Sequence, residues 1–417
     1  MRKMIVMAAL CFLAAAGFLV ACRETGLILE SGQTKETTLT FWHFDTGHQE
    51  FYENLAADYA GDHAGVNIEI RMIPQDAYAG EWIKEAEDGR MADVFAIPPE
   101  SLGQFIDTGK LAALSYEELL AGENGQEPLI NGGMGEEFWA LPAAGSLPVI
   151  FYNSGIYEQN QLKVPETLSD FVVNCVILKQ SGAVPLGMSL SEEGRLEAFD
   201  LAAGLLVNGS RVAGGKEKKG DFKKLLDGNT GYYDLFGMAM ELSTDKGVCA
   251  QGHQALLEGF AQGKYAMIPG TTEDIALLKE TMSSSFDWFQ LPGEDYTRAG
   301  VWKGELLFGA AKKGKELKEA KEFLACFMTR ENQMAFAEEF GKIPAIRGLK
   351  PENGEAARAY DLLSGKKEVY LSCFQTMTRG EKEVCAEQLD LLFSGKAMEP
   401  EEFLDGWVKK LKDQRGK

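Results

Sequence analysis

The segment "EFWALPAAGSLPVIFYN" (Glu137–Asn153) links one apolar strand to another through two prolines and several small residues. A chain that crosses from one domain to another needs a link of this kind. The total length of 417 residues supports this interpretation, because single hydrophobic cores rarely grow beyond about 250–300 residues. The sequence therefore predicts two domains, with one of their connections in this segment.

Before this segment, strand and helix patterns alternate. Thr38–Phe44 is β-branched and aromatic, Val66–Ile73 alternates at period two, and Ala92–Ile97 is a short apolar run. Helical patterns separate these three strands. This order predicts a parallel sheet covered on both faces. Right-handed crossovers bring the carboxyl ends of the strands to one edge, where open α/β sheets bind ligands.

After the segment, a second set of helices and short strands is expected from Val164 to Glu280. Ser285–Gly293 is predicted as a strand closed by Pro-Gly, and Gly341–Gly348 as another proline-bearing connection. The tail from Pro351 to Lys417 has apolar residues at helical spacing. The second half of the chain is therefore expected to be mixed α/β with a helical end.

Two local features follow the first connection. Asn153, in the turn "NSG", is expected to bond the neighbouring backbone. In "VPETLSD", Thr167 is expected to be the N-cap of a helix, with Asp170 near the favourable end of the helix dipole. The adjacent Tyr152 either packs in the core or faces a ligand.

The N-terminus has the pattern of an export signal. Arg2 and Lys3 precede an apolar run from Met4 to Val20, and "LVAC" ends at Cys22. Leu-Val-Ala-Cys resembles a bacterial lipobox, which implies cleavage before Cys22 and a lipid on its sulfur. The alternative is an uncleaved N-terminal anchor. With the lipid, the mature chain is expected on the outer face of a cytoplasmic membrane.

The charge excludes one class of partner. The formal net charge is −21, and removal of residues 1–21 takes away two positive charges and no negative one. Nucleic acid is not expected as a partner, because neutralising its phosphates needs a basic patch. Five cysteines remain after Cys22, at wide spacing, so they predict no disulfide framework, although one bridge is possible. They are Cys175, Cys249, Cys326, Cys373 and Cys385.

Motifs for catalysis and metal binding are missing from the sequence. The four histidines form no His-x-x-x-His or H-E-x-x-H pattern, and no G-x-S-x-G elbow occurs. "GAAKKGKE" (Gly309–Glu316) is nearly a P-loop, but Glu316 replaces the hydroxyl that would hold Mg²⁺, so a turn after a strand is favoured. No enzyme activity, metal or cofactor is expected.

The ordered segments resemble the extracellular solute-binding proteins of ABC importers, in the carbohydrate-binding group that includes maltose-binding protein. Each segment is a weak signal, but their order covers most of the chain. They are the lipobox, "LTFWHF", "ADVFAI", "FIDTGKLAALS", "FWALPAAGSLPVIFYNSGIYEQNQLKVPETLSDF", "GFAQGKYAMIPG", "FQLPG", "KEAKEFLACFMTRENQMAF" and "GKIPA".

The resemblance implies an α/β, two-lobed periplasmic-binding-protein-like fold. Each lobe is expected to be a mostly parallel sheet flanked by helices, with a ligand cleft between the lobes and hinge closure around the ligand. The expected hinge crossings are Ala140–Gly145, Phe289–Gly293 and Lys342–Ile346. The expected organisation is a signal peptide at 1–21, a linker at 22–37, an N-terminal lobe at 38–142 with 291–343, and a C-terminal lobe at 143–290 with 344–417.

Sugars offer apolar faces and many hydroxyls, so their sites need aromatic rings, amides and carboxylates. Trp42, Phe44 and Asp45 end the first strand at the predicted ligand edge; Trp42 alternatively packs in the core, and Asp45 alternatively caps the next helix. The resemblance favours Tyr152 as a cleft-facing tyrosine. It also implies an aromatic after "KYAMIPG", where Thr271 and Thr272 stand instead.

Other rings could replace the missing platform. Trp302 is left between core and site, Trp288 is expected in the core, and Tyr232-Tyr233 is a further candidate. The predicted ligand-binding set is Trp42, Phe44, Asp45, Tyr152, Thr271 and Trp302.

The resemblance implies a monomeric, lipid-anchored binding protein that delivers a sugar or oligosaccharide to ABC permease subunits. The alternatives are a surface sensor of the same fold that presents a solute to a membrane kinase, and a secreted glycosidase.

Overall fold

The computed structural model describes residues 36–122, 126–130, 138–189, 249–250, 252–290, 299–352, 354–372, 375, 379–393 and 399–415. Within these ranges, no helix combines the length and apolarity that a bilayer crossing requires. The predicted signal segment, Cys22 and the Tyr232-Tyr233 pair lie outside them.

The larger of the two main sheets has seven strands, which come from both the N-terminal and the C-terminal parts of the chain. Its order is β12-β4-β11-β3-β1-β2, and β13 also pairs with β11. Its strands are β1 (Thr37–His43), β2 (Val66–Met72), β3 (Val94–Ile97), β4 (Leu141–Ser146), β11 (Ala299–Ala310), β12 (Ile343–Pro344) and β13 (Glu368–Leu371).

The three strands predicted at the start of the chain are confirmed as β1, β2 and β3. Strand β1 pairs in parallel with both β2 and β3, so their carboxyl ends share one edge of the sheet.

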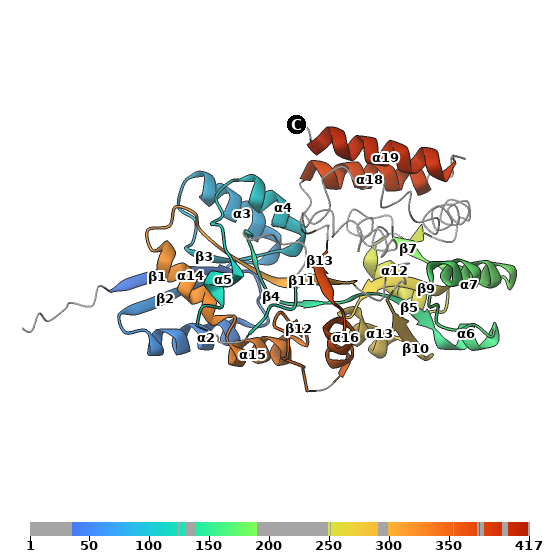
Figure 1. Cartoon of the computed structure of the whole chain (residues 1–417), viewed down its shortest axis with the longest axis horizontal. Coiled ribbons are helices and arrows are strands. Elements are labelled where there is room, and N and C mark those ends of the chain that lie inside the picture. Colours follow the sequence, from blue (N-terminus) through green and yellow to red (C-terminus); the bar gives the residue numbers. More distant parts are fainter. Residues whose placement is uncertain are drawn as a thin grey trace, which may run out of the picture.

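Four further strands form a smaller sheet, in the order β10-β5-β9-β6. They are β5 (Pro148–Asn153), β6 (Val184–Leu186), β9 (Tyr265–Thr271) and β10 (Phe286–Phe289). Figure 1 shows the two sheets side by side, with β4 and β11 lying along the connection between them. A short parallel pair, β7 (Met188–Ser189) with β8 (Cys249–Ala250), lies beside the smaller sheet.

The α/β fold class is confirmed, but the expectation of mostly parallel sheets holds only in part, because three of the six strand pairs in the larger sheet are parallel and the smaller sheet is mostly antiparallel. Strand β11 runs antiparallel to both β3 and β4, and β12 runs antiparallel to β4. In the smaller sheet, β5 runs antiparallel to β9 and β10, and only β6 with β9 is parallel. Strands that connect the two sheets explain the antiparallel pairs. A βαβ crossover within one sheet makes neighbouring strands parallel, whereas a strand that enters from the other sheet can run in either direction.

The chain changes sheets close to the expected first crossing. Strand β4 ends at Ser146 in the larger sheet and β5 begins at Pro148 in the smaller one, so Leu147 is the point of change. The second expected crossing falls largely in 291–298, outside the described residues. At the third, β12 joins the larger sheet through β4. The exact lobe boundaries remain a prediction.

Helices cover both sheets. Beside the larger sheet lie α2 (Gln49–Asp62), α3 (Gln75–Glu87), the 3-10 helix η1 (Pro99–Ser101), α4 (Leu102–Asp107), α5 (Tyr116–Leu119), α14 (Leu317–Cys326) and α15 (Arg330–Phe340). Beside the smaller sheet lie α6 (Ser154–Gln159), α7 (Leu168–Gln180), α12 (His253–Ala261) and α13 (Asp274–Thr281). In Figure 1, α16 (Gly354–Ser364) lies between the groups, and α18 (Arg379–Phe393) pairs with α19 (Pro400–Arg415) above them.

Local signals at the start of α6 and α7 are confirmed. Asn153 caps α6, because its Oδ1 accepts a hydrogen bond from the amide of Ile156 at 3.1 Å. Thr167 and Asp170 form a capping box at α7, in which each side chain accepts a hydrogen bond from the other's amide. Both side chains therefore satisfy amides that the first helical turn leaves unpaired.

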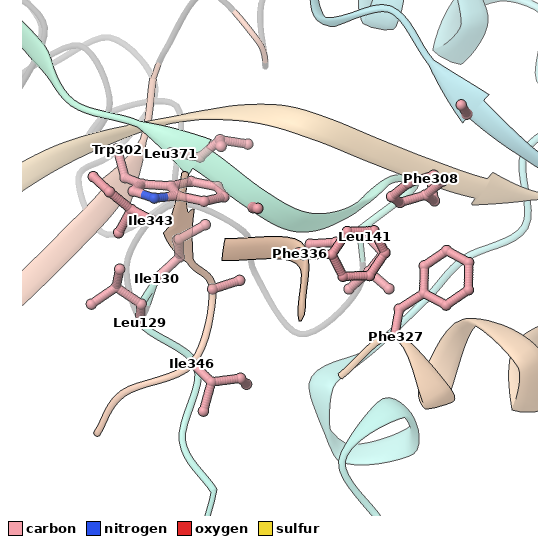
Figure 2. Packing of buried hydrophobic residues seen from close by; sticks show 14 of the residues in the cluster. Leu129, Ile130, Leu141, Trp302, Phe308, Phe327, Phe336, Ile343, Ile346 and Leu371 are labelled. Carbon is pink, nitrogen blue, oxygen red and sulfur yellow. The ribbon is translucent and has the colours of Figure 1, made fainter. Parts of the chain in front are cut away.

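One continuous hydrophobic core joins the two sheets. It contains residues from β5 and β9 as well as from β1, β4 and β11. Figure 2 shows its centre, where Trp302 of β11 packs near Leu371 of β13 and Ile343 of β12. Cys175 and Cys326 are free, and burial raises the pKa of both thiols. Their thiols are therefore inert packing groups.

Candidate functional site

A cavity of about 600 Å³ opens where the carboxyl ends of β1 and β3 meet the smaller sheet. Phe44 and Asp45 border it just after β1, and Lys342 follows α15. His253, at the start of α12, and Glu273, after β9, border it from the side of the smaller sheet. Both halves of the molecule therefore contribute to one site.

The first wall combines a carboxylate with aromatic faces. Oδ1 of Asp45 accepts a hydrogen bond from the amide of Gly47 at 3.0 Å, and Oδ2 lies 2.7 Å from Nδ1 of His48. The His48 ring is 4.2 Å from the ring of Phe340, which also borders the cavity. Phe44 is half-buried against Tyr78, at 5.1 Å between ring centroids.

Asp45 does not cap α2, because the N-cap position is His48 and no side-chain cap bond forms there. Its carboxylate instead orients His48 at the cavity wall.

The end of α15 places a lysine in the cavity. Gly341 has a left-handed backbone, with φ of 62°, and this ends the helix just before Lys342. The ammonium of Lys342 contacts the carboxylate of Glu273 from the opposite wall. Desolvation by burial lowers the pKa of Lys342 to about 8, while the charge of Asp45 acts in the opposite direction.

The second wall is formed by the turn after β9. The amide of Thr271 donates to Oδ2 of Asp274 at 2.8 Å, and Oδ1 of the same carboxylate lies 2.7 Å from Nε2 of His253. Thr272 Oγ1 accepts a hydrogen bond from the amide of Leu147 at 3.1 Å. The two threonines that replace the expected aromatic platform therefore fix the turn and the sheet crossing.

Strand β11 and the segment after β13 complete the cavity. Oε1 of Glu305 accepts a hydrogen bond from Ser146 Oγ at 2.8 Å and lies 3.1 Å from Nζ of Lys303. The amide group of Gln375 bonds both the N–H and the carbonyl of Gly304, at 2.8 Å and 2.5 Å. From α18, Lys382 also reaches the cavity.

Of the six residues predicted to bind ligand, the structure places Phe44 and Asp45 at the cavity. Trp42 is buried beneath Arg71, whose guanidinium lies 4.7 Å from the indole. Thr271 is buried. Trp302 has no exposed surface (0%) and lies in the core (Figure 2). None of these last three borders the cavity.

Tyr152 also lies away from the cavity. It is half-buried, with ring centroids 4.5 Å from Tyr157 and 5.8 Å from Phe289. Trp288 is confirmed as a buried residue; its Nε1 donates to Glu355 at 2.9 Å, and the guanidinium of Arg358 lies 3.9 Å from its ring.

Several cavity residues were not predicted. Phe340 ends the predicted helical region, and Lys342 begins the expected crossing in "GKIPA"; neither pattern indicated a site. His48 and Glu273 stand in polar stretches and Glu305 and Gln375 beside apolar residues, and no motif or spacing marks any of the four as a site residue. A glycine after a long amphipathic helix was the one local signal that marked the position of Lys342.

The arrangement suits a hydroxyl-rich ligand. The rings of Phe44 and Phe340, which border the cavity, can contact the apolar C–H groups of a ligand. The carboxylates and lysines of the walls can accept and donate hydrogen bonds to hydroxyls. Over the described residues, no group of three or more His, Cys, Asp or Glu side chains could hold a metal ion.

Comparisons with known proteins bear on the family and the fold. The family model described as "Bacterial extracellular solute-binding protein" matches residues 45–334. A multiple sugar-binding protein of Streptococcus mutans is 23% identical over 356 residues, which is 80% of each chain.

Two solved structures share the fold. A family 1 extracellular solute-binding protein from Bifidobacterium longum subsp. infantis has a TM-score of 0.67 and 13% identity, with 92% of this chain and 99% of that chain covered. RafE of Streptococcus pneumoniae, in complex with raffinose, has a TM-score of 0.58 and 18% identity, with 90% and 98% covered.

Proposed function

This chain belongs to the bacterial extracellular solute-binding protein family, and we propose that it captures a sugar or oligosaccharide in the cavity between its two sheets. In this proposal the protein delivers the sugar to the permease of an ABC transporter and performs no chemistry on it. A lipid on Cys22 holds it at the outer face of the membrane.

The composition of the cavity carries the proposal. Phe44 and Phe340 supply apolar faces, Asp45 supplies a carboxylate just after β1, and Glu305 supplies one from β11. A sugar ring offers both an apolar face and vicinal hydroxyls, so it can use both kinds of group at once. The names of the similar proteins, a multiple sugar-binding protein and a raffinose complex, support the same ligand class.

Isothermal titration against a panel of mono- and oligosaccharides tests the ligand class. We expect saturable binding of at least one sugar, and its affinity should fall in Phe340→Ala. The control is Phe286→Ala, because Phe286 is a phenylalanine of β10 outside the cavity. Tight binding of a peptide, a metal ion or a polyamine, with no binding of any sugar, would sink the assignment.

The anchor has its own test. Fractionation of cells that express the wild-type chain should place it in the membrane, and Cys22→Ser should release it to the medium or leave its precursor uncleaved. Mass spectrometry of the membrane form should find a lipid on the peptide that begins with Cys22. An unmodified Cys22 in a membrane-bound chain would contradict the lipid anchor and leave the sugar site untouched.

A further inference from the structure

Lys342 and Glu273 connect the two sides of the cavity. Lys342 lies between α15 and β12, and β12 pairs with β4 in the larger sheet. Glu273 follows β9, which belongs to the smaller sheet. Their charged groups are in direct contact. This ion pair therefore spans the cavity from one sheet's side to the other.

The two partners are buried unequally. The Lys342 side chain is 14% exposed and that of Glu273 is 37% exposed. The cost of the contact therefore falls on the lysine, which loses most of its water. A buried ammonium without a counterion is strongly destabilising, whereas a paired one is close to neutral.

The other nearby carboxylate is already engaged. Asp45 attracts Lys342, but it bonds the amide of Gly47 and lies 2.7 Å from His48. Asp45 follows β1 of the larger sheet, so it lies on the same side of the cavity as Lys342. Glu273 is the carboxylate that reaches Lys342 from the opposite side of the cavity.

We propose that Glu273 is a positioning residue for closure of the cavity, because it supplies the counterion that lets the two sides approach over the buried side chain of Lys342. When Glu273 is neutral, closure buries an unpaired ammonium, and the open arrangement, in which water reaches Lys342, is favoured. When the charges of both Lys342 and Glu273 are removed, closure no longer buries an unpaired ammonium. The inference concerns the protein without ligand, so it does not depend on which solute is bound.

The experiment measures the distance between the two halves in ligand-free protein by pulsed electron paramagnetic resonance. Spin labels are attached to ketone side chains introduced at Asp58 of α2 and Gln180 of α7, which are both exposed. Ketone chemistry spares the native cysteines. The variants are Glu273→Gln and the double change Lys342→Met with Glu273→Gln.

We expect Glu273→Gln to shift the distance distribution to longer values and the double variant to return it to the wild-type distribution. The matched control is Glu322→Gln, which removes a carboxylate from the exposed pair Lys318–Glu322 within α14; its distribution should equal the wild type. An unchanged distribution in Glu273→Gln overturns the proposal, as does a double variant as open as the single one. Sugar titrations of the same variants separate this result from failure of the proposed ligand.

Discussion

The indole of Trp302 occupies the space into which a β-carbon at Gly145 would project. Such a carbon would lie 2.6 Å from Cζ2 of the ring and would also overlap the carbonyl oxygen of Lys303. Gly145 therefore allows β4 to pass directly over the tryptophan of β11. This close approach lies next to the point where the chain changes sheets.

We expect Gly145→Ala to force β4 and β11 apart and to lower the free energy of unfolding by about 1–3 kcal/mol, as overpacking does. Urea unfolding measures the loss. Gly61→Ala is the matched control, because a β-carbon at Gly61 in α2 meets nothing within 4 Å; it should stabilise the protein by about 0.5–1 kcal/mol. Equal effects at the two positions would show that the approach of Trp302 does not constrain position 145.

Thr167→Ala should remove half of the capping box of α7 and cost about 1 kcal/mol of unfolding free energy. The amide of Asp170 then loses the hydroxyl that it bonds at 3.1 Å. Ser169→Ala is the control, since this exposed serine makes no such bond in the described part of the chain. Thermal unfolding followed by circular dichroism compares the two, and a loss in Ser169→Ala as large as in Thr167→Ala contradicts the role of the cap.

Local pattern was enough to predict the first three strands and the caps. Alternation and helical spacing are properties of neighbouring residues, and so are the capping hydrogen bonds of Asn153 and Thr167. Phe44 and Asp45 were found for a related reason. They follow a strand whose parallel partners fix which edge it ends on.

The rest of the site depends on contacts between distant segments. Lys342 and Glu273 meet only because two sheets pack together, and neither is marked by its neighbours in sequence. The alternation of a single strand does not show what covers each of its faces, so the sequence alone does not decide between core and site for Trp302. In the fold, β11 pairs with β13 from Ala299 to Trp302 and with β4 from Lys303 onward, and the tryptophan between these pairings has no exposed surface.

The burial of Lys342 should appear in the pH dependence of stability. Its pKa is about 8 in the folded protein, compared with 10.5 for an ordinary lysine. Between these pH values the unfolded chain binds more protons than the folded one, so the free energy of unfolding rises with pH. A pKa difference of this size changes the free energy of unfolding by about 3 kcal/mol across this pH range.

The measurement is the difference in unfolding free energy between the wild type and Lys342→Met, from pH 7 to pH 10.5. We expect this difference to move in favour of the wild type as the pH rises above about 8. The carboxylates that face the lysine are those of Asp45 and Glu273. A difference that is flat or falls across this window contradicts a desolvated Lys342.

Asp45 and Tyr152 are both predicted from the sequence to bind ligand, but only Asp45 borders the cavity, so substitutions at the two positions test where the ligand binds. Asp45 borders the cavity, whereas Tyr152 packs against Tyr157 and Phe289 away from it. Asp45→Asn should weaken sugar binding about 10-fold to 100-fold, because a hydrogen bond to a charged group contributes about 1.5–3 kcal/mol. Tyr152→Phe keeps the ring and should leave the affinity unchanged.

Titration calorimetry with the best sugar of the panel compares these two variants with the wild type. Asp62→Asn, at the far end of α2, serves as the control for loss of one negative charge. If Tyr152→Phe loses affinity and Asp45→Asn keeps it, the ligand binds beside β5 and not in the cavity at the end of β1. That outcome would restore the tyrosine as a site residue and move the ligand to the smaller sheet.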